Sequence, residues 1–158
     1  MASKTKISFE PTRVSLESKY GIISTQWNKS IVDLLLVNAE RELINQGVNK
    51  KNIIKIEVPG AFEIPIAAMK MASSNVDVVI ALGAIIRGET LHFELIANSC
   101  AKGLNEVSLE LKKPMIFGVL TTDSKAQALE RADPEKGNRG AELAKSAMAI
   151  IESLDTFR

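Results

Sequence analysis

The chain has 158 residues, of which 46% are hydrophobic and 25% are charged, proportions typical of one globular domain with a core of its own. Twenty basic side chains nearly balance nineteen acidic ones, for a net charge of +1, and this balance argues against a nucleic-acid-binding protein, which needs a basic excess on one face. A single cysteine and a single histidine exclude an internal disulfide and a structural zinc site, because such a site needs about four Cys or His ligands.

The first 18 residues are predicted to form an N-terminal arm, and residues 19–158 a single domain. The arm is polar and interrupted by Pro11, with weak alternation around 7–9 and 14–16, so residues 5–17 suit docking as an edge strand on another subunit. No apolar stretch follows its basic residues, which argues against a secretory signal. No apolar run approaches the roughly 18 residues of a membrane helix. We therefore expect a cytoplasmic protein without a membrane partner.

Beyond the arm, strand patterns alternate with helix patterns. Strands are predicted at 20–24, 53–58, 76–86 and 114–120. Helices are predicted at 31–43, at 62–73 with Pro65 in the first turn, from 88–90 to 111 with Cys100 facing the core, at 124–132, and over 143–154. The run 76–86 is the most apolar and is typical of a central strand buried on both faces. This alternation predicts a three-layer α/β/α sandwich with a flavodoxin-like, four-stranded parallel sheet.

Ligands of such sheets bind beyond the carboxyl ends of the strands, which here selects residues 25–28, 59–63, 84–92 and 117–123. In the segment GAIIRGETLH (83–92) a strand runs through a glycine turn into a predicted helix, whose free backbone N–H groups form an anion site. Gly88 would let the backbone approach a ligand closely, and Thr90 would cap the helix or donate to a phosphate. Alternatively, Glu89 and Thr90 are simply favourable residues for the start of a helix.

Three further side chains at these strand ends have two readings each. His92, the only histidine, is either a satisfied structural residue or an acid/base group beside the anion site. Trp27, the only tryptophan, either fills the core or stacks on a planar heterocycle. Glu63 either stabilises a helix start or accepts hydrogen bonds from hydroxyl groups. Arg131 and Lys136 flank a loop and indicate nothing by themselves.

Taken together, these segments resemble the lumazine synthase family of riboflavin biosynthesis. The matching stretches are WN (27–28), VPGAFEIP (58–65), ALGAIIRGET (81–90), HF (92–93), AKG (101–103), PMIFGVLTT (114–122), QALERA (127–132) and GNRG (137–140). They occur in order over about residues 20–152. No single stretch is decisive, but the set is highly specific.

The resemblance implies a transferase that needs neither cofactor nor metal. It would condense 5-amino-6-(D-ribitylamino)uracil with 3,4-dihydroxy-2-butanone 4-phosphate into 6,7-dimethyl-8-ribityllumazine, phosphate and water, the penultimate step of riboflavin biosynthesis. Trp27 would stack on the aminouracil ring, residues 61–63 would hold its ribityl chain, residues 84–86 would line the ring pocket, and a phenylalanine would close it. The implied aminouracil site is thus Trp27, Ala61, Phe62, Glu63, Ala84, Ile85, Ile86 and Phe117.

By the same resemblance, Glu89, Thr90 and Arg131 would bind the phosphate, and His92 would be the acid/base. Phe117 and Arg131 would reach in from a neighbouring subunit, so the site would exist only in a homo-oligomer. The family forms pentamers, with the N-terminal segment added to a neighbour's sheet, and some pentamers build sixty-subunit icosahedral shells. We expect at least a pentamer, leave the shell open, and regard riboflavin synthase as a candidate partner.

The chain also departs from the family pattern, and other functions stay open. Trp27 stands where a phenylalanine is common, and Arg139 where a lysine is common. A non-catalytic flavin or lumazine carrier would need only the stacking pocket. A flavodoxin-type redox protein would instead use a bound flavin phosphate. Retention of His92, Arg131 and the anion loop argues against the carrier.

Overall fold

The computed structural model describes residues 6–157, and residues 1–5 and 158 lie outside the description. Within residues 6–157, four parallel strands form one sheet in the order β2-β1-β3-β4, which confirms the predicted parallel sheet. The strands are β1 (Tyr20–Thr25), β2 (Ile53–Val58), β3 (Val78–Ile86) and β4 (Met115–Thr122). β3 is paired on both sides and its first seven residues are buried, as expected of the most apolar run.

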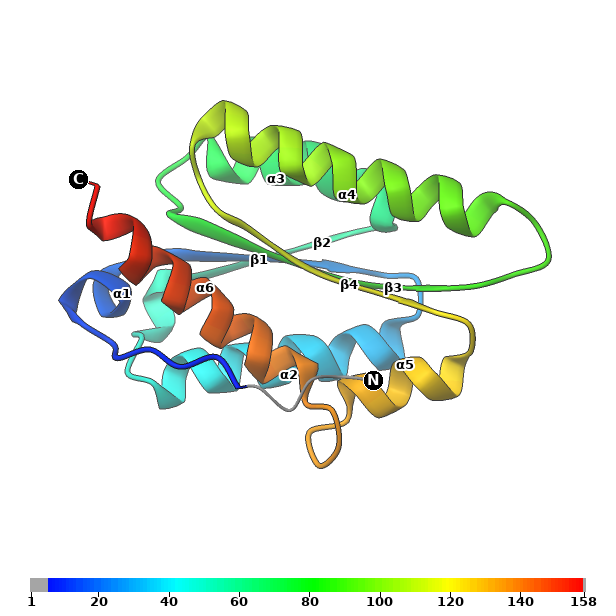
Figure 1. Ribbon diagram of the computed structural model, residues 1–158, viewed down its shortest axis with the longest axis horizontal. Coiled ribbons are helices and arrows are strands. Elements are labelled where there is room, and N and C mark those ends of the chain that lie inside the picture. The colour runs from blue at the N-terminus through cyan, green and yellow to red at the C-terminus, as the bar shows by residue number, and fades with distance from the viewer. Residues whose placement is uncertain (1–5, 158) are drawn as a thin grey trace.

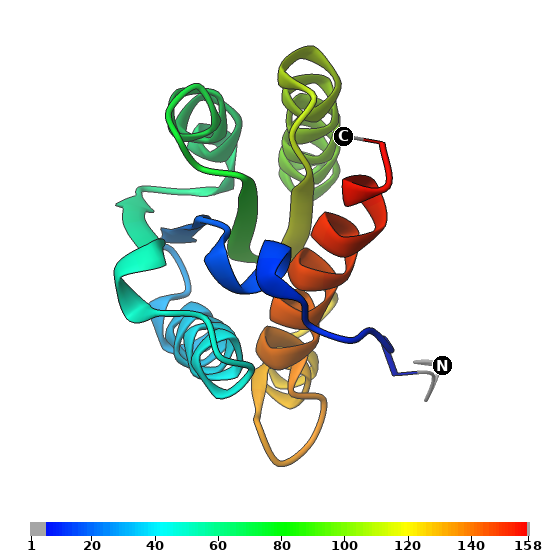
Figure 2. The ribbon, with the colours of Figure 1, turned by 90° about the vertical axis from the view of Figure 1, so that its left-hand side faces the viewer.

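Helices cover both faces of the sheet, so the predicted α/β/α sandwich is also confirmed. The helices are α1 (Arg13–Glu17), α2 (Lys29–Asn45), α3 (Ile64–Ala72), α4 (His92–Leu111), α5 (Lys125–Ala132) and α6 (Arg139–Asp155). α3 and α4 lie on one face, and α1, α2, α5 and α6 lie on the other (Figures 1 and 2). Over residues 6–157, every helix is too short or too polar to span a membrane.

Each face of the sheet has its own buried core. The side of α2, α5 and α6 contains Leu82 and Leu143, and the side of α3 and α4 contains Cys100. Cys100 is buried in α4, as predicted, and burial raises the pKa of its thiol to about 11. Close helix packing anchors the start of α6: a Cβ on Gly140 would lie 2.5 Å from the carbonyl oxygen of Leu35 in α2.

The end of the N-terminal arm is helical, so the strand expected around 14–16 is wrong. The side chain of Thr12 caps α1 by accepting from the backbone N–H of Val14 at 3.3 Å. The carboxylate of Glu152 in α6 accepts from the backbone N–H groups of Thr12 and Ser15, at 2.8 and 3.3 Å. These bonds dock α1 on the chain's own α6. The expected strand addition by earlier arm residues stays a prediction, and residues 1–5 lie outside the described part.

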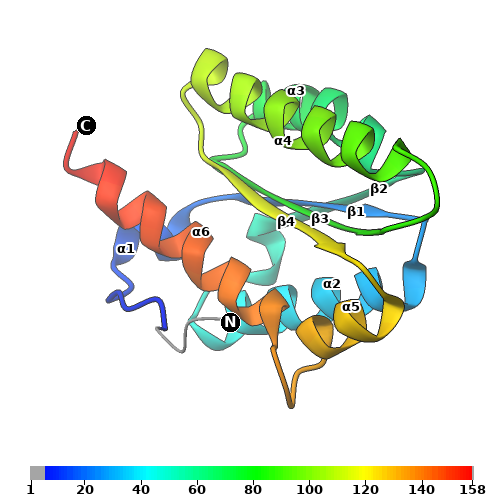
Figure 3. The ribbon, with the colours of Figure 1, turned by 45° about the vertical axis from the view of Figure 1, so that its right-hand side comes forward.

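Two helices begin later than predicted. A 3₁₀ turn (Ala61–Glu63) precedes α3, so Pro65 is the second residue of the helix, a place that tolerates its missing N–H. α4 begins at His92, not at 88–90, because the chain first leaves the sheet in a wide loop, seen beyond the strand ends in Figure 3. At the base of that loop the backbone N–H of Arg87 donates to the carbonyl of Thr122 at 2.9 Å.

Candidate functional site

The carboxyl ends of β1, β2 and β3 are joined by hydrogen bonds at one edge of the sheet. The backbone N–H of Trp27 donates to the carbonyl of Pro59 at 3.1 Å. The side-chain amide of Asn28, a residue in the left-handed region with φ 57°, donates to the carbonyl of Ala84 at 2.7 Å. The three strand ends selected from the sequence therefore meet, and Asn28, to which the sequence assigned no role, holds them together.

Trp27 lies on the surface of this edge and is 73% exposed. Its ring rests beside Gly60, where a Cβ would approach the indole Cδ1 to 3.1 Å. The exposure rules out the reading of Trp27 as a core residue in this chain. Phe62, two residues after Gly60, is also exposed, so this edge carries exposed apolar surface.

The neighbouring site residues differ in how they can contact a ligand. The carboxylate of Glu63 accepts from the backbone N–H of Gly60 at 2.8 Å, so Glu63 does stabilise the start of the helix. A carboxylate has two acceptor oxygens, and this bond still leaves it able to bind a hydroxyl. Ala61 and Ala84 are buried, which leaves mainly their backbone groups for a ligand. Residues 85 and 86 are half-buried and pack against opposite cores.

The predicted anion loop is open, but its geometry differs from the expectation. A Cβ on Gly88 would meet nothing within 4 Å, and its φ is not positive, so packing within the chain does not require glycine there. The N–H groups that can face a ligand belong to the first turn of α4, which begins at His92 and has Leu91, not Thr90, as its N-cap residue. The hydroxyl of Thr90 accepts a long bond of 3.4 Å from the backbone N–H of His92, and its own hydrogen stays free to donate.

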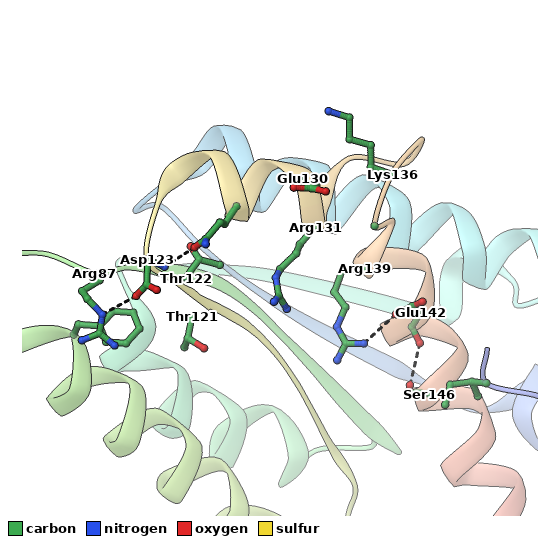
Figure 4. Close-up of a pocket in the computed structure, with 14 residues that line it drawn as sticks. Arg87, Thr121, Thr122, Asp123, Glu130, Arg131, Lys136, Arg139, Glu142 and Ser146 are labelled. Carbon is green, nitrogen blue, oxygen red and sulfur yellow. Dashed lines mark hydrogen bonds and ion pairs between the residues drawn. The ribbon is translucent and has the colours of Figure 1, made fainter. Parts of the chain in front are cut away.

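A groove of about 1220 Å³ lies between the end of β4, α5 and the start of α6, with Ile7 of the arm on its wall. Three of its cationic side chains come from the end of α5, the following loop and the start of α6: Arg131, Lys136 and Arg139. Figure 4 shows Arg131 and Arg139 extending into it, with an Arg139 Nη1 to Glu142 Oε2 distance of 3.0 Å. The lining also holds the carboxylates of Asp123, Glu130 and Glu142, so its four cationic side chains leave only a small excess of positive charge.

The predicted site residues fall into two groups within one chain. Arg131 lines the groove, whereas the residues around Trp27 and the exposed His92 do not. Phe117 lies on the edge strand β4 and is 39% exposed. A contribution of Phe117 and Arg131 to a neighbour's site stays a prediction.

Arg87 is a residue whose contacts the sequence did not reveal. Its guanidinium pairs with Asp123 at 2.7 Å and with Glu94, and it lies 4.4 Å above the ring centre of Phe93. The partner residues are 7 and 36 positions away, so no local spacing rule finds both. Nowhere in residues 6–157 do three or more His, Cys, Asp or Glu side chains form a group able to hold a metal ion.

The fold and strand-end geometry can be compared with known families. A family model described as 6,7-dimethyl-8-ribityllumazine synthase matches residues 17–155. The match spans all four strands and both helical layers. The chain therefore belongs to the 6,7-dimethyl-8-ribityllumazine synthase family, an enzyme family of riboflavin biosynthesis.

Proposed function

We propose that the protein condenses 5-amino-6-(D-ribitylamino)uracil with 3,4-dihydroxy-2-butanone 4-phosphate to give 6,7-dimethyl-8-ribityllumazine, phosphate and water. The observation that carries the proposal is the exposed indole of Trp27, beside Gly60 at the joined strand ends of a lumazine synthase family chain. A flat apolar side chain left open to solvent suits stacking on the planar pyrimidine. Glu63 and the backbone of residues 61–62 then hold the ribityl chain.

The chemistry needs proton transfer and alignment more than a reactive nucleophile on the enzyme. The amine of the aminouracil attacks the ketone, and water leaves as the imine forms. Phosphate is then eliminated, and ring closure releases another water. We assign the proton transfers to His92, at the exposed start of α4, because histidine exchanges protons readily near neutral pH. Holding both substrates in register supplies the entropic part of catalysis.

We place the phosphate between the 88–91 loop of one copy and Arg131 of a neighbouring copy. Thr90 has a hydroxyl hydrogen to donate, and the backbone N–H of Glu89 and the first N–H groups of α4 add a partial positive field. Arg131 supplies a planar, permanently charged fork, in a groove that also carries Lys136 and Arg139. Phe117 of the neighbour would close the heterocycle pocket.

This arrangement requires assembly, and we propose at least a pentamer. Large apolar residues stay exposed on one chain, among them Leu91, which is 82% exposed, Leu95 and Ile66. Apolar surface of this kind marks sites of protein contact. We also propose that the arm preceding α1 adds to a neighbour's sheet.

The test is to mix the purified protein with both substrates and follow the absorbance and fluorescence of the lumazine, subtracting the spontaneous rate. Acceleration that needs both substrates and releases phosphate in step with product supports the proposal. No acceleration, from protein shown to be assembled, refutes it and favours the non-catalytic flavin or lumazine carrier. A redox-active bound flavin would favour the flavodoxin-type alternative.

A further inference from the structure

The loop before α4 has little internal support. Residues 88–91 are all exposed, and the hydroxyl of Thr90 holds only the backbone N–H of His92, at 3.4 Å. A Cβ on Gly88 would meet nothing within 4 Å, so packing does not hold that position either. The position of such a loop depends on how firmly its two ends are attached to the fold.

Arg87 attaches both ends. At the start of the loop its backbone N–H donates to the carbonyl of Thr122 at 2.9 Å. Its guanidinium pairs with Glu94 in the first turn of α4, at the far end of the loop. The same guanidinium donates through Nε to Asp123 Oδ1 at 2.7 Å, beyond the end of β4 (Figure 4). The side chain thus links the start of α4 to the turn before α5, while the backbone of the same residue ties the start of the loop to β4.

The ion pairs of Arg87 restrain the relative orientation of the segments they join as well as the distance between them. A guanidinium is planar and its N–H groups form a rigid fork, so pairing with carboxylates on two elements orients those elements relative to each other. The ring of Phe93 lies under the guanidinium, 4.4 Å from Cζ, and restrains it further. Hydrogen bonds from Arg87 lower the pKa of Glu94, so the Glu94 carboxylate stays ionised at neutral pH and keeps its pairing with the guanidinium.

The same contacts contribute little to overall stability. The Arg87 side chain is 46% exposed and that of Asp123 71%, and ion pairs open to solvent are weak in net terms. The Arg87 ion pairs therefore matter for the position of the loop residues and not for the stability of the whole fold.

We propose that Arg87 is a positioning residue, which holds the 88–91 loop and the first turn of α4 so that Thr90 and His92 meet the keto phosphate. The proposal rests on the proposed function, because it concerns the geometry of that reaction. Arg87 itself need not touch a substrate.

The test compares Arg87→Ala, Arg87→Lys and a matched control in the assembled protein. The control is Lys102→Ala, which removes another exposed ion pair of α4, the one with Glu106 at 3.9 Å. For Arg87→Ala we expect kcat to fall roughly tenfold to a hundredfold, as small misplacements of reacting groups do, while KM for the aminouracil stays within about twofold, since its stacking site is untouched. Arg87→Lys recovers part of kcat, because an ammonium pairs with one carboxylate at a time.

Hydrogen exchange, followed by mass spectrometry on peptides covering residues 88–95, gives a readout independent of activity. We expect faster exchange in Arg87→Ala than in the wild type and no change in Lys102→Ala. A double-mutant cycle completes the test: Asp123→Asn lowers kcat in the wild-type background and has little further effect in Arg87→Ala. If Arg87→Ala does not assemble, Asp123→Asn and Glu94→Gln carry the same comparison.

Unchanged kcat and unchanged exchange in assembled Arg87→Ala overturn the inference, while the wild type still makes lumazine. A rise in KM for both substrates with kcat unchanged also overturns it, because that pattern indicates binding and not positioning. An inactive wild type refutes the proposed function instead, and unchanged exchange would then also refute the attachment of the loop by Arg87.

Discussion

Replacing Trp27 with alanine separates a stacking role from a structural one. Because Trp27 is 73% exposed, the substitution removes little packed surface, and the free energy of unfolding should change by no more than about 0.5 kcal/mol. Stacking of a base on an aromatic side chain is worth about 1–3 kcal/mol by alanine substitution, so the dissociation constant of the aminouracil should rise roughly 5- to 150-fold. Trp27→Phe keeps a ring and should lose only a small part of this affinity.

Two measurements on the assembled protein distinguish a stacking role of Trp27 from a structural one. Calorimetric titration with the aminouracil gives the dissociation constants, and urea unfolding at fixed protein concentration gives the stabilities. The wild type offers an added signal, because Trp27 is the only tryptophan and its fluorescence should be quenched by a stacked ring. Equal affinity of Trp27→Ala and wild type would refute the stacking role. A loss of about 2 kcal/mol or more in stability would indicate a core role instead.

Three further outcomes follow from the structure. His92→Ala should slow lumazine formation by roughly 10²–10⁴ without abolishing it, and complete loss in an intact assembly would contradict the dominance of alignment. Arg131→Ala should chiefly raise KM for the keto phosphate, by a factor of about ten or more for a lost charged hydrogen bond, and an unchanged KM would count against its role. Burial raises the pKa of Glu152, but hydrogen bonds from Ser15 and Thr12 outweigh it and lower the pKa below 4.5, so ionised Glu152 stabilises the fold above that pH. Glu152→Gln should therefore be less stable than wild type at neutral pH, and urea unfolding should show this difference shrinking as the pH falls through the folded pKa.

The fold followed from the sequence because its signals were strong and local. The apolar run 76–86 indicated a central strand, and β3 lies between β1 and β4 with its first seven residues buried. Pro65 limited where α3 begins. The arm was misread because five residues give too few periods to separate alternation from a helical turn. The helix there depends on Glu152, more than 130 positions away, which no local pattern contains.

Of the candidate site, only the residues at the strand ends could be located from the sequence. The carboxyl-end rule placed Trp27, Gly60 and Ala84 at one edge, and their hydrogen bonds and contacts bear this out. The sequence left open whether Trp27 is buried, because exposure depends on what packs against a loop. It also missed the contacts of Arg87, whose partners come from two other elements.

The predicted site residues lie on two different surfaces of one chain, and this separation gives a physical reason for assembly. The surface with Trp27 and the surface with Arg131 differ, so joining one to the other between copies makes a head-to-tail contact. Contacts of this kind close into rings when the rotation between copies allows it, and in a ring every copy gives one surface and receives the other. Arg87 lines the groove of Arg131 and also anchors the loop of Thr90, so within each copy it connects the two surfaces. In such a ring, the proposed positioning role of Arg87 would bear on both sites to which a copy contributes.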